Sequence, residues 1–429
     1  MMRFNKTLDN KTRIITRQGI LPQALITIVV LASPGISLAA QPEDAVNFAI
    51  GAAMRYEDNL FRIDDDTDPR GIAGKSRRSD LITTTNIGIK IDKLYAQQRF
   101  QLDLEAIKND YQTYDYLDFT AKNYRAAWLW HLTPNLSGTI LLDRQQSQSS
   151  FADFLNGNNQ VIQQQSLQTN ESRVFNADWL VGGGLHLLGG VSEFRSRNDS
   201  AAFNAVGDYV QDGVEVGVKY VARSENSISL IQRESTGDVN GRPVNPFTQF
   251  DSGFKQRETE AELNYRLTGK SYIDARLGYI KREHDNFPSR DYDGIDGQVA
   301  YIWTPTGKLR IVSSLSRSYG SYQQAFNSYY ISDTLAIAPV WEVTAKTKIR
   351  AKYSYSERDY HGAISLAGVP EGELREDKVQ ALSLAAEWQA TRSILVTGTL
   401  QHEVRNSNFD SFGLDYDANS IGISGQLPF

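Results

Sequence analysis

Polar and apolar side chains alternate along much of this chain, and this alternation restricts the possible folds more than any other feature of the sequence. In residues 348–356, Lys348, Arg350 and Lys352 share one face with two serines, while the residues between them, from Ile349 to Tyr355, are apolar or aromatic. The segments 99–106, 258–267 and 394–403 repeat the pattern. A period of two residues is typical of a strand with one polar and one apolar face, whereas helical spacing would mix the two sets. The sequence therefore predicts an all-β fold.

Alternation alone fits two architectures. In a soluble sandwich the charged face lies outside, but in a membrane barrel it lines the interior and the apolar face meets lipid. Five turns help to decide, because in each an aromatic residue at a strand end precedes a short polar turn and a new strand. These residues are Trp130, Tyr265, Trp303, Trp341 and Trp388. Tryptophan and tyrosine form girdles at membrane interfaces, so the pattern favours a membrane barrel with these residues as its periplasmic girdle.

Longer polar connections separate these turns, as expected of extracellular loops. They are rich in Asn, Asp, Gly, Ser and Gln, and cover residues 60–79, 147–169, 197–207, 236–250, 358–375 and 406–414. This rhythm predicts a single transmembrane antiparallel β-barrel of about 18 strands, with about 16 as the alternative, short periplasmic turns and long extracellular loops. A barrel of that size can enclose a water-filled channel.

Both ends of the chain are consistent with export to a bacterial cell outer membrane. Basic residues precede the mostly apolar segment 20–32, and Ser37, Leu38 and Ala39 form a signal-peptidase site. We therefore expect residues 1–39 to be a signal peptide and residues 40–429 to be the barrel. An uncleaved anchor is the alternative, although the apolar segment is shorter than the ~20 residues that a helical span needs. The last segment, 420–429, resembles the closing strand of outer-membrane barrels, in which a terminal aromatic residue, here Phe429, is the barrel-assembly signal.

Composition excludes several other classes of protein. After residue 40 no apolar run is long enough for a transmembrane helix, and the mean hydropathy is -0.42. There is no cysteine, so disulfide bonds do not hold the fold together. Residues 1–39 carry five basic residues and one acidic residue, so the formal charge changes from -6 to -10 when they are removed. This charge argues against nucleic acid as a partner. A soluble periplasmic glycan-binding or structural protein is a further alternative.

Several short segments resemble the outer-membrane barrels encoded with exopolysaccharide biosynthesis systems, often called the EpsL-like family. These segments are Tyr56 to Arg62, Arg78 to Asp80, Arg290 to Gly294, Trp303 to Lys308 and Arg405 to Asn408. The resemblance runs from about Val46 to Phe429 and implies a passive pore that takes part in exopolysaccharide export or biosynthesis. The implied partners are outer-membrane lipid, the polysaccharide, and periplasmic or inner-membrane components of polysaccharide synthesis and export. A general diffusion porin for small solutes is the alternative function.

The predicted inner face carries the candidate lumen-lining charges. They are Lys348, Arg350, Lys352, Glu258, Glu260, Glu262 and Arg276. In one interpretation, opposite charges pair across neighbouring strands and only solvate the wall, with Glu262 near Arg276 in the hairpin that turns at residues 268–270. In the other, the rows of like charge guide an acidic or phosphorylated glycan.

Tyrosines near the expected outer mouth form a second candidate set. They are Tyr111, Tyr114, Tyr116, Tyr292, Tyr322, Tyr329 and Tyr330. A tyrosine ring can stack on a sugar while its hydroxyl hydrogen-bonds to it, so these residues are candidates for glycan contact. Tyrosine is also a common girdle residue, and some of the set would then face lipid headgroups.

The acidic residues at the first loop are candidate ligands of Ca²⁺, which binds several carboxylate oxygens. They are Glu57, Asp58, Asp64, Asp65, Asp66 and Asp68, and their spacing differs from that of an EF-hand. Solvated acidic loops are the simpler interpretation.

The sequence predicts no enzyme and no cofactor. The histidines are His131, His186, His284, His361 and His402, and they are scattered outside any recognisable nucleophile or metal motif. No GxxxxGK[ST] phosphate-binding loop is present, so energy for any active export would come from other components.

Overall fold

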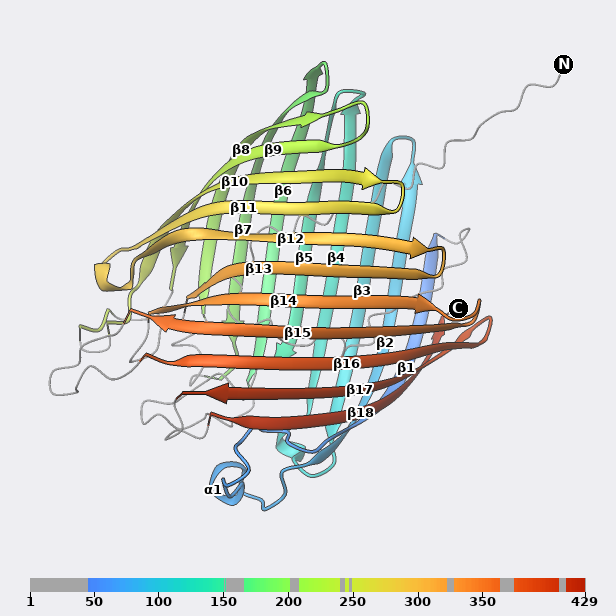
Figure 1. Cartoon of the computed structure of the whole chain (residues 1–429), viewed down its shortest axis with the longest axis vertical. Coiled ribbons are helices and arrows are strands. Elements are labelled where there is room, and N and C mark those ends of the chain that lie inside the picture. The colour runs from blue at the N-terminus through green and yellow to red at the C-terminus, as the bar shows by residue number, and fades with distance from the viewer. Residues whose placement is uncertain are drawn as a thin grey trace.

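Strands that follow one another in the sequence pair with each other, and the first strand also pairs with the last. The computed structural model describes residues 45–149, 151, 166–200, 208–239, 244–246, 249–321, 328–362, 374–408 and 414–428. Its strands are β1 (Val46–Glu57), β2 (Asp80–Tyr95), β3 (Gln98–Tyr111), β4 (Phe119–Thr133), β5 (Leu136–Gln148), β6 (Leu167–Gly182), β7 (Leu185–Asn198), β8 (Tyr209–Val221), β9 (Ser227–Asp238), β10 (Gly253–Thr268), β11 (Ser271–His284), β12 (Tyr292–Thr306), β13 (Leu309–Ser321), β14 (Tyr329–Glu342), β15 (Thr347–His361), β16 (Glu376–Thr391), β17 (Ile394–Ser407) and β18 (Tyr416–Pro428). The antiparallel pairs β1–β2 and β1–β18 close the sheet into a barrel (Figure 1).

The structure confirms the predicted 18-stranded antiparallel barrel, and the alternative of 16 strands is wrong. Neighbouring strands lie ~4.8 Å apart and barrel strands tilt by ~40°, so a circular barrel of this strand number is ~35 Å wide between backbones. Side chains of the wall alone do not fill such a bore, which leaves space for water.

The two rims of the barrel differ in the length of their connections. At one rim short turns join the strands, for example between Thr268 and Ser271 and between Thr306 and Leu309. The ends of the barrel chain meet at the same rim, where Ala49 pairs with Pro428. The longer connections lie at the opposite rim, which we call the mouth. There the strands continue beyond the predicted loop bounds. Arg358, for example, pairs with Ser332 and Asp377 as part of β15, and its side chain continues the inward row of that strand.

Alternate residues of a strand differ in exposure, which identifies the two faces of the wall. In β10, Glu258 and Glu260 are buried, whereas Arg257 and Thr259 beside them are exposed. The exposed face of the barrel carries large apolar residues such as Ile337, so it is the outer surface. The face with buried charges is the concave inner wall, where side chains of neighbouring strands crowd together.

Apolar and aromatic residues form a band on the outer surface. On β14 the exposed residues Trp341, Ile337 and Leu335 lie in one outward row, which continues to Asp333. Trp341 and Asp333 are 8 residues apart. At ~3.4 Å per residue and a tilt of ~40°, this distance is ~21 Å along the barrel axis. Transmembrane barrels carry an apolar band of ~25 Å, so the outer surface suits a bilayer.

In the part of the chain that the structure describes, single helical turns occur in three mouth connections: α1 (Arg70–Ala73), η1 (Asp115–Leu117) and η2 (Pro288–Arg290). Among the described residues, no helix is long and apolar enough to cross a membrane. The predicted signal peptide and Phe429 lie outside the described residues, so both of these assignments stay predictions.

Candidate functional site

The inner wall of β8–β12 carries a connected network of ion pairs. Its members are Glu215, Arg233, Glu258, Glu260, Arg276 and Asp296. Arg233 lies 3.1 Å from Glu258, and Arg276 lies 2.9 Å from Glu260. Glu258 and Glu260 are each 2% exposed, so both carboxylates depend on these arginines for their stabilisation. Two guanidinium groups serve four carboxylates here, so the network has a net negative charge.

Strand register alone does not give the partners of Arg276. Glu262 is its register partner across the β10–β11 hairpin, but the guanidinium also extends toward the mouth and contacts Glu260 and Asp296. The next inward position of β11 is Gly278, where an added Cβ would lie 2.4 Å from Asp296 Oδ1. The glycine therefore provides the space in which carboxylates from the two neighbouring strands, β10 and β12, gather around one arginine.

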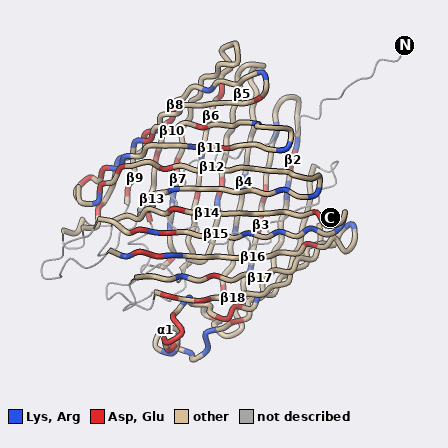
Figure 2. The backbone as a smooth tube through the Cα atoms, in the orientation of Figure 1, with Lys and Arg blue, Asp and Glu red and all other residues tan. Residues whose placement is uncertain are grey.

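The inner wall of β15 carries the basic row. Lys348, Arg350 and Lys352 lie on the same face as the buried residues Arg358 and Tyr360. Arg350 Nε lies 2.5 Å from Glu387 of β16, which is also an inner-wall residue. Within the described part of the chain, neither Lys348 nor Lys352 has an ion-pair partner. This part of the wall therefore presents positive charge to the bore, and Figure 2 shows the basic residues of β15 in blue.

Arginine and aromatic side chains pair along the inner wall near the mouth, and the sequence reasoning missed these pairs. Arg282 stacks over Phe254 at 3.8 Å and over Tyr292 at 5.3 Å, measured to the ring centroids. The other pairs are Arg358 with Tyr330, Arg375 with Tyr360 and Arg405 with Tyr416. Each pair joins residues from different strands or connections, so the sequence does not reveal which residues are partners. The signal that the sequence does offer is an arginine on the inward row near a strand end. Cation–π contacts of this kind anchor both side chains.

Most of the candidate tyrosines are buried. Tyr111, Tyr114, Tyr292 and Tyr330 are at most 8% exposed, so their rings are not accessible for stacking on a passing sugar. Tyr116 is 42% exposed, and Tyr329 is partly buried against His361, with ring centroids 5.3 Å apart. Tyr322 lies outside the described residues. Among the candidate tyrosines that the structure describes, only Tyr116 has an exposed ring.

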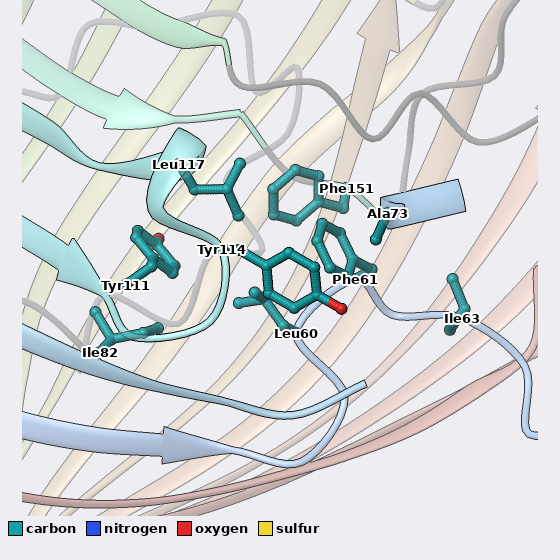
Figure 3. Packing of buried hydrophobic residues seen from close by; sticks show 9 residues of the cluster. All are labelled: Leu60, Phe61, Ile63, Ala73, Ile82, Tyr111, Tyr114, Leu117 and Phe151. Carbon is teal, nitrogen blue, oxygen red and sulfur yellow. The ribbon is translucent and has the colours of Figure 1, made fainter. Parts of the chain in front are cut away.

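A hydrophobic cluster lies on the inner side of the wall at the mouth, beside β2 and β3 (Figure 3). It consists of Leu60, Phe61, Ile63, Ala73, Ile82, Tyr111, Tyr114, Leu117 and Phe151. Phe61 and Tyr114 are fully buried, and their rings meet edge to face with centroids 4.8 Å apart. Asp80, the first residue of β2, accepts hydrogen bonds from the backbone N–H groups of Thr113 and Tyr114 and so ties the start of β2 to the β3–β4 connection. Because Ile82 and Tyr111 are inner-wall residues, the cluster occupies part of the cross-section of the mouth.

The acidic residues of the first loop have local partners. Glu57 lies 3.0 Å from Arg62, Asp65 lies 3.0 Å from Arg78, and Asp58 accepts hydrogen bonds from Asn419. Asp64 and Asp68 accept hydrogen bonds from backbone N–H groups two residues further along the chain, while Asp66 is exposed. In the part of the chain that the structure describes, no group of three or more His, Asp or Glu residues could hold a metal ion.

Aromatic residues line the rim with the short turns. Tyr265, Trp303, Trp341 and Trp388 have exposed rings on the outer surface. Trp130 differs, because its ring is 5% exposed, lies over Gly138 and stacks on Phe175. Further exposed aromatic residues at this rim that the turn pattern did not single out are Tyr95, Trp128, Trp179 and Tyr220. For Tyr95, Trp179 and Tyr220 the signal in the sequence is the same aromatic residue before a turn, without the following threonine, whereas Trp128 precedes the same turn as Trp130.

The histidines serve local contacts. His186 Nδ1 lies 2.5 Å from Asp178, which also contacts Lys219 on the inner wall. His402 faces outward and lies 2.8 Å from Asn419 Oδ1.

Comparisons with known proteins found distantly similar outer-membrane proteins and one family model. The outer-membrane protein OpdK of Pseudomonas aeruginosa is 11% identical, with 90% of this chain and 99% of that chain covered and a TM-score of 0.46. OccK2 (OpdF) of the same species is 12% identical over 90% of this chain and 98% of that chain, with a TM-score of 0.49. OccAB3 of Acinetobacter baumannii is 9% identical over 90% and 99%, with a TM-score of 0.46. No curated protein matches the chain. Residues 252–427, which contain nearly all of β10–β18, match the model of the family described as "Putative beta-barrel porin 2".

Proposed function

We propose that this protein is a porin of the bacterial outer membrane, through which small solutes diffuse. The observation that carries the proposal is a closed 18-stranded barrel with its charged face inside and an apolar band outside. Barrels of this size enclose water, and lipid covers the apolar face. The family match over residues 252–427 supports the same class of channel.

The exopolysaccharide conduit implied by the sequence resemblance has less support. Its expected contact residues include Tyr111, Tyr114, Tyr292 and Tyr330, whose rings are buried by packing. The matched family is described as a porin, with no mention of polysaccharide. We therefore place diffusion of small solutes before polysaccharide export.

We also propose that the inner-wall charges influence which solutes pass. Lys348 and Lys352 offer positive charge on β15, whereas Glu258 and Glu260 belong to a network with net negative charge on the wall of β8–β12. Charged groups that line a pore select among permeant ions. The accessible lysines have more influence in this proposal than the carboxylates, because the carboxylates are buried and paired.

Planar-bilayer recordings of the purified full-length protein test the proposed function. We expect steady ohmic conductance, and liposomes that contain the protein should swell in small sugars more slowly as the sugar becomes larger. Added exopolysaccharide should leave the current unchanged. Brief blockades by polysaccharide would favour the export conduit instead, and a correctly folded barrel without conductance would contradict both channel functions.

A further inference from the structure

A groove lies on the outer surface of the barrel across β5–β10, near the mouth. Its volume is about 710 Å³, and its apolar lining includes Leu142, Phe175, Val191 and Val214. These four side chains are exposed, so the groove opens to the surroundings of the barrel and not to the bore. In a membrane the surroundings at this place are lipid.

Basic side chains lie on both sides of the groove. Arg173 of β6 is on one side, 3.2 Å from Glu193, and Lys255 and Arg257 of β10 are on the other, with Arg257 3.6 Å from Glu234. The side chains of Arg173 and Arg257 are 52% and 66% exposed, so both guanidinium groups are accessible. Since neighbouring strands lie ~4.8 Å apart, β6 and β10 are ~19 Å apart along the wall.

These charges lie at the edge of the apolar band. On β10 the outward row begins with Tyr265 at the short-turn rim, continues through Leu263 and Ala261, and then reaches Arg257 and Lys255 toward the mouth. Figure 2 shows charged segments at the mouth ends of β9–β11. The groove therefore combines an apolar part within the band and basic groups at the level of lipid headgroups.

We propose that this groove binds a diphosphorylated glycolipid of the outer leaflet, of the lipid A type. Its acyl chains lie on Phe175, Val191 and Val214, one phosphate contacts Arg173, and the other contacts Lys255 and Arg257. Two separate basic ends match two phosphates, which compete with Glu193 and Glu234 for the guanidinium groups, whereas a lipid with one phosphate occupies only one end. The inference rests on the proposed outer-membrane location but is independent of the solute that the channel carries.

Asp212 allows a more specific prediction about lipid binding. It lies on β8 within the groove, between the two basic ends, and has no ion-pair partner within the described part of the chain. Its charge repels phosphate unless a divalent cation bridges the two groups. With divalent cations removed, Asp212→Asn should therefore bind the glycolipid more tightly than the native protein.

Native mass spectrometry of the full-length protein in detergent tests the proposal with three lipids: lipid A, dephosphorylated lipid A and phosphatidylglycerol. The native protein should retain lipid A most strongly. The triple variant Arg173→Gln, Lys255→Gln, Arg257→Gln should bind it about tenfold more weakly or worse, which is the effect of losing ~1.4 kcal/mol. The matched control is Arg317→Gln on β13, because Arg317 is also 52% exposed and pairs with Asp333 at 2.5 Å. This control should bind lipid A like the native protein.

Three results would overturn the proposal. They are equal retention of lipid A and its dephosphorylated form, phosphatidylglycerol binding as tight as that of lipid A, and unchanged lipid A binding by the triple variant. If the native protein is a dimer and the triple variant is a monomer with unchanged lipid binding, the groove is instead a contact between copies of this chain. Heat-modifiable migration in gels checks the fold of each variant, and conductance of the same samples reports on the porin function separately.

Discussion

Asp251, in the connection between β9 and β10, shows how one carboxylate can organise the mouth. It is fully buried and accepts hydrogen bonds from the side chain of Asn286 at 2.7 Å and from the backbone N–H groups of Asn286, Phe287 and Ser252. Burial by itself would raise the pKa of Asp251, but these hydrogen bonds outweigh it and the pKa is lowered. The carboxylate thus ties the β9–β10 connection to the one between β11 and β12.

We predict that Asp251→Asn weakens this link by about 1–3 kcal/mol, because an amide replaces a charged acceptor and one backbone donor loses its partner. Limited proteolysis of the folded barrel at neutral pH should cut the variant faster near residues 249–253. The lowered pKa sets the pH dependence: the native advantage is complete above the ordinary value of 3.8 and disappears as the pH falls through the lower folded value.

Asp66→Asn is the matched control for Asp251, because Asp66 also lies in a mouth connection but is exposed. It should be cut like the native protein at every pH. Equal cutting of Asp251→Asn and the native protein at neutral pH would show that the carboxylate does not hold the two connections together.

At the scale of elements, the first loop is held by packing against the inner wall. Phe61 is fully buried, and its ring centroid lies 4.8 Å from that of Tyr114 and 5.0 Å from that of Phe151. Phe61→Ala should remove about 3–5 kcal/mol of local packing. We expect faster proteolysis within residues 60–79 and a larger single-channel conductance, because the loop then leaves the cross-section of the mouth.

Tyr116→Ala tests the specificity of this effect. The Tyr116 ring is 42% exposed at the edge of the cluster, 5.9 Å from that of Tyr114. Its loss should change neither proteolysis nor conductance appreciably. If Phe61→Ala loosens the loop without any increase in conductance, then the cluster does not limit the current.

The basic row of β15 is the second element whose role can be measured. Replacing Lys348, Arg350 and Lys352 by glutamine removes positive charge from the bore and leaves the carboxylates of β8–β12 in place. We predict a several-fold shift of permeability toward cations, measured as the reversal potential in a salt gradient. Lys378→Gln on the exposed outer face of β16 is the control and should leave the reversal potential unchanged. An unchanged potential in the triple variant would exclude the row from selectivity.

For the whole molecule, we expect lipid to cover the outer surface of the barrel. Ile337 lies midway along the outward row from Trp341 to Asp333, and the adjacent Ala336 lies on the inner wall between Ser314 and Ser354. Ile337→Arg should therefore destabilise the inserted barrel by about 2–4 kcal/mol. Ala336→Arg places the same side chain in the bore, next to small polar neighbours, and should cost much less.

Urea unfolding of the two arginine variants in lipid vesicles measures this difference. A larger loss of stability for Ile337→Arg places the exposed face in lipid. Equal losses, or a larger loss for Ala336→Arg, would contradict the assignment of the two faces on which the porin proposal depends.

Much of this architecture follows from local patterns in the sequence. A period of two assigns each residue to a face, so Lys348, Arg350 and Lys352 could be placed together before their surroundings were known. Aromatic residues before short turns mark one rim, although Trp130 shows that such a residue can lie flat against the outer wall, over a neighbouring glycine, with its ring covered. A strand number of about 18 could be predicted because each hairpin repeats the alternation and the turn signals.

The sequence alone could not predict which side chains are partners across the wall. Arg276 contacts Glu260 and Asp296 because Gly278 leaves space, and Phe61, Tyr114 and Phe151 meet although they lie in three separate connections. The sequence by itself determined strands, faces and rims, since these depend on neighbours within a few residues. Only the tertiary structure decided the ion-pair partners, the packing of the mouth and the outer groove, since these depend on strand stagger and on loops that fold back over the wall.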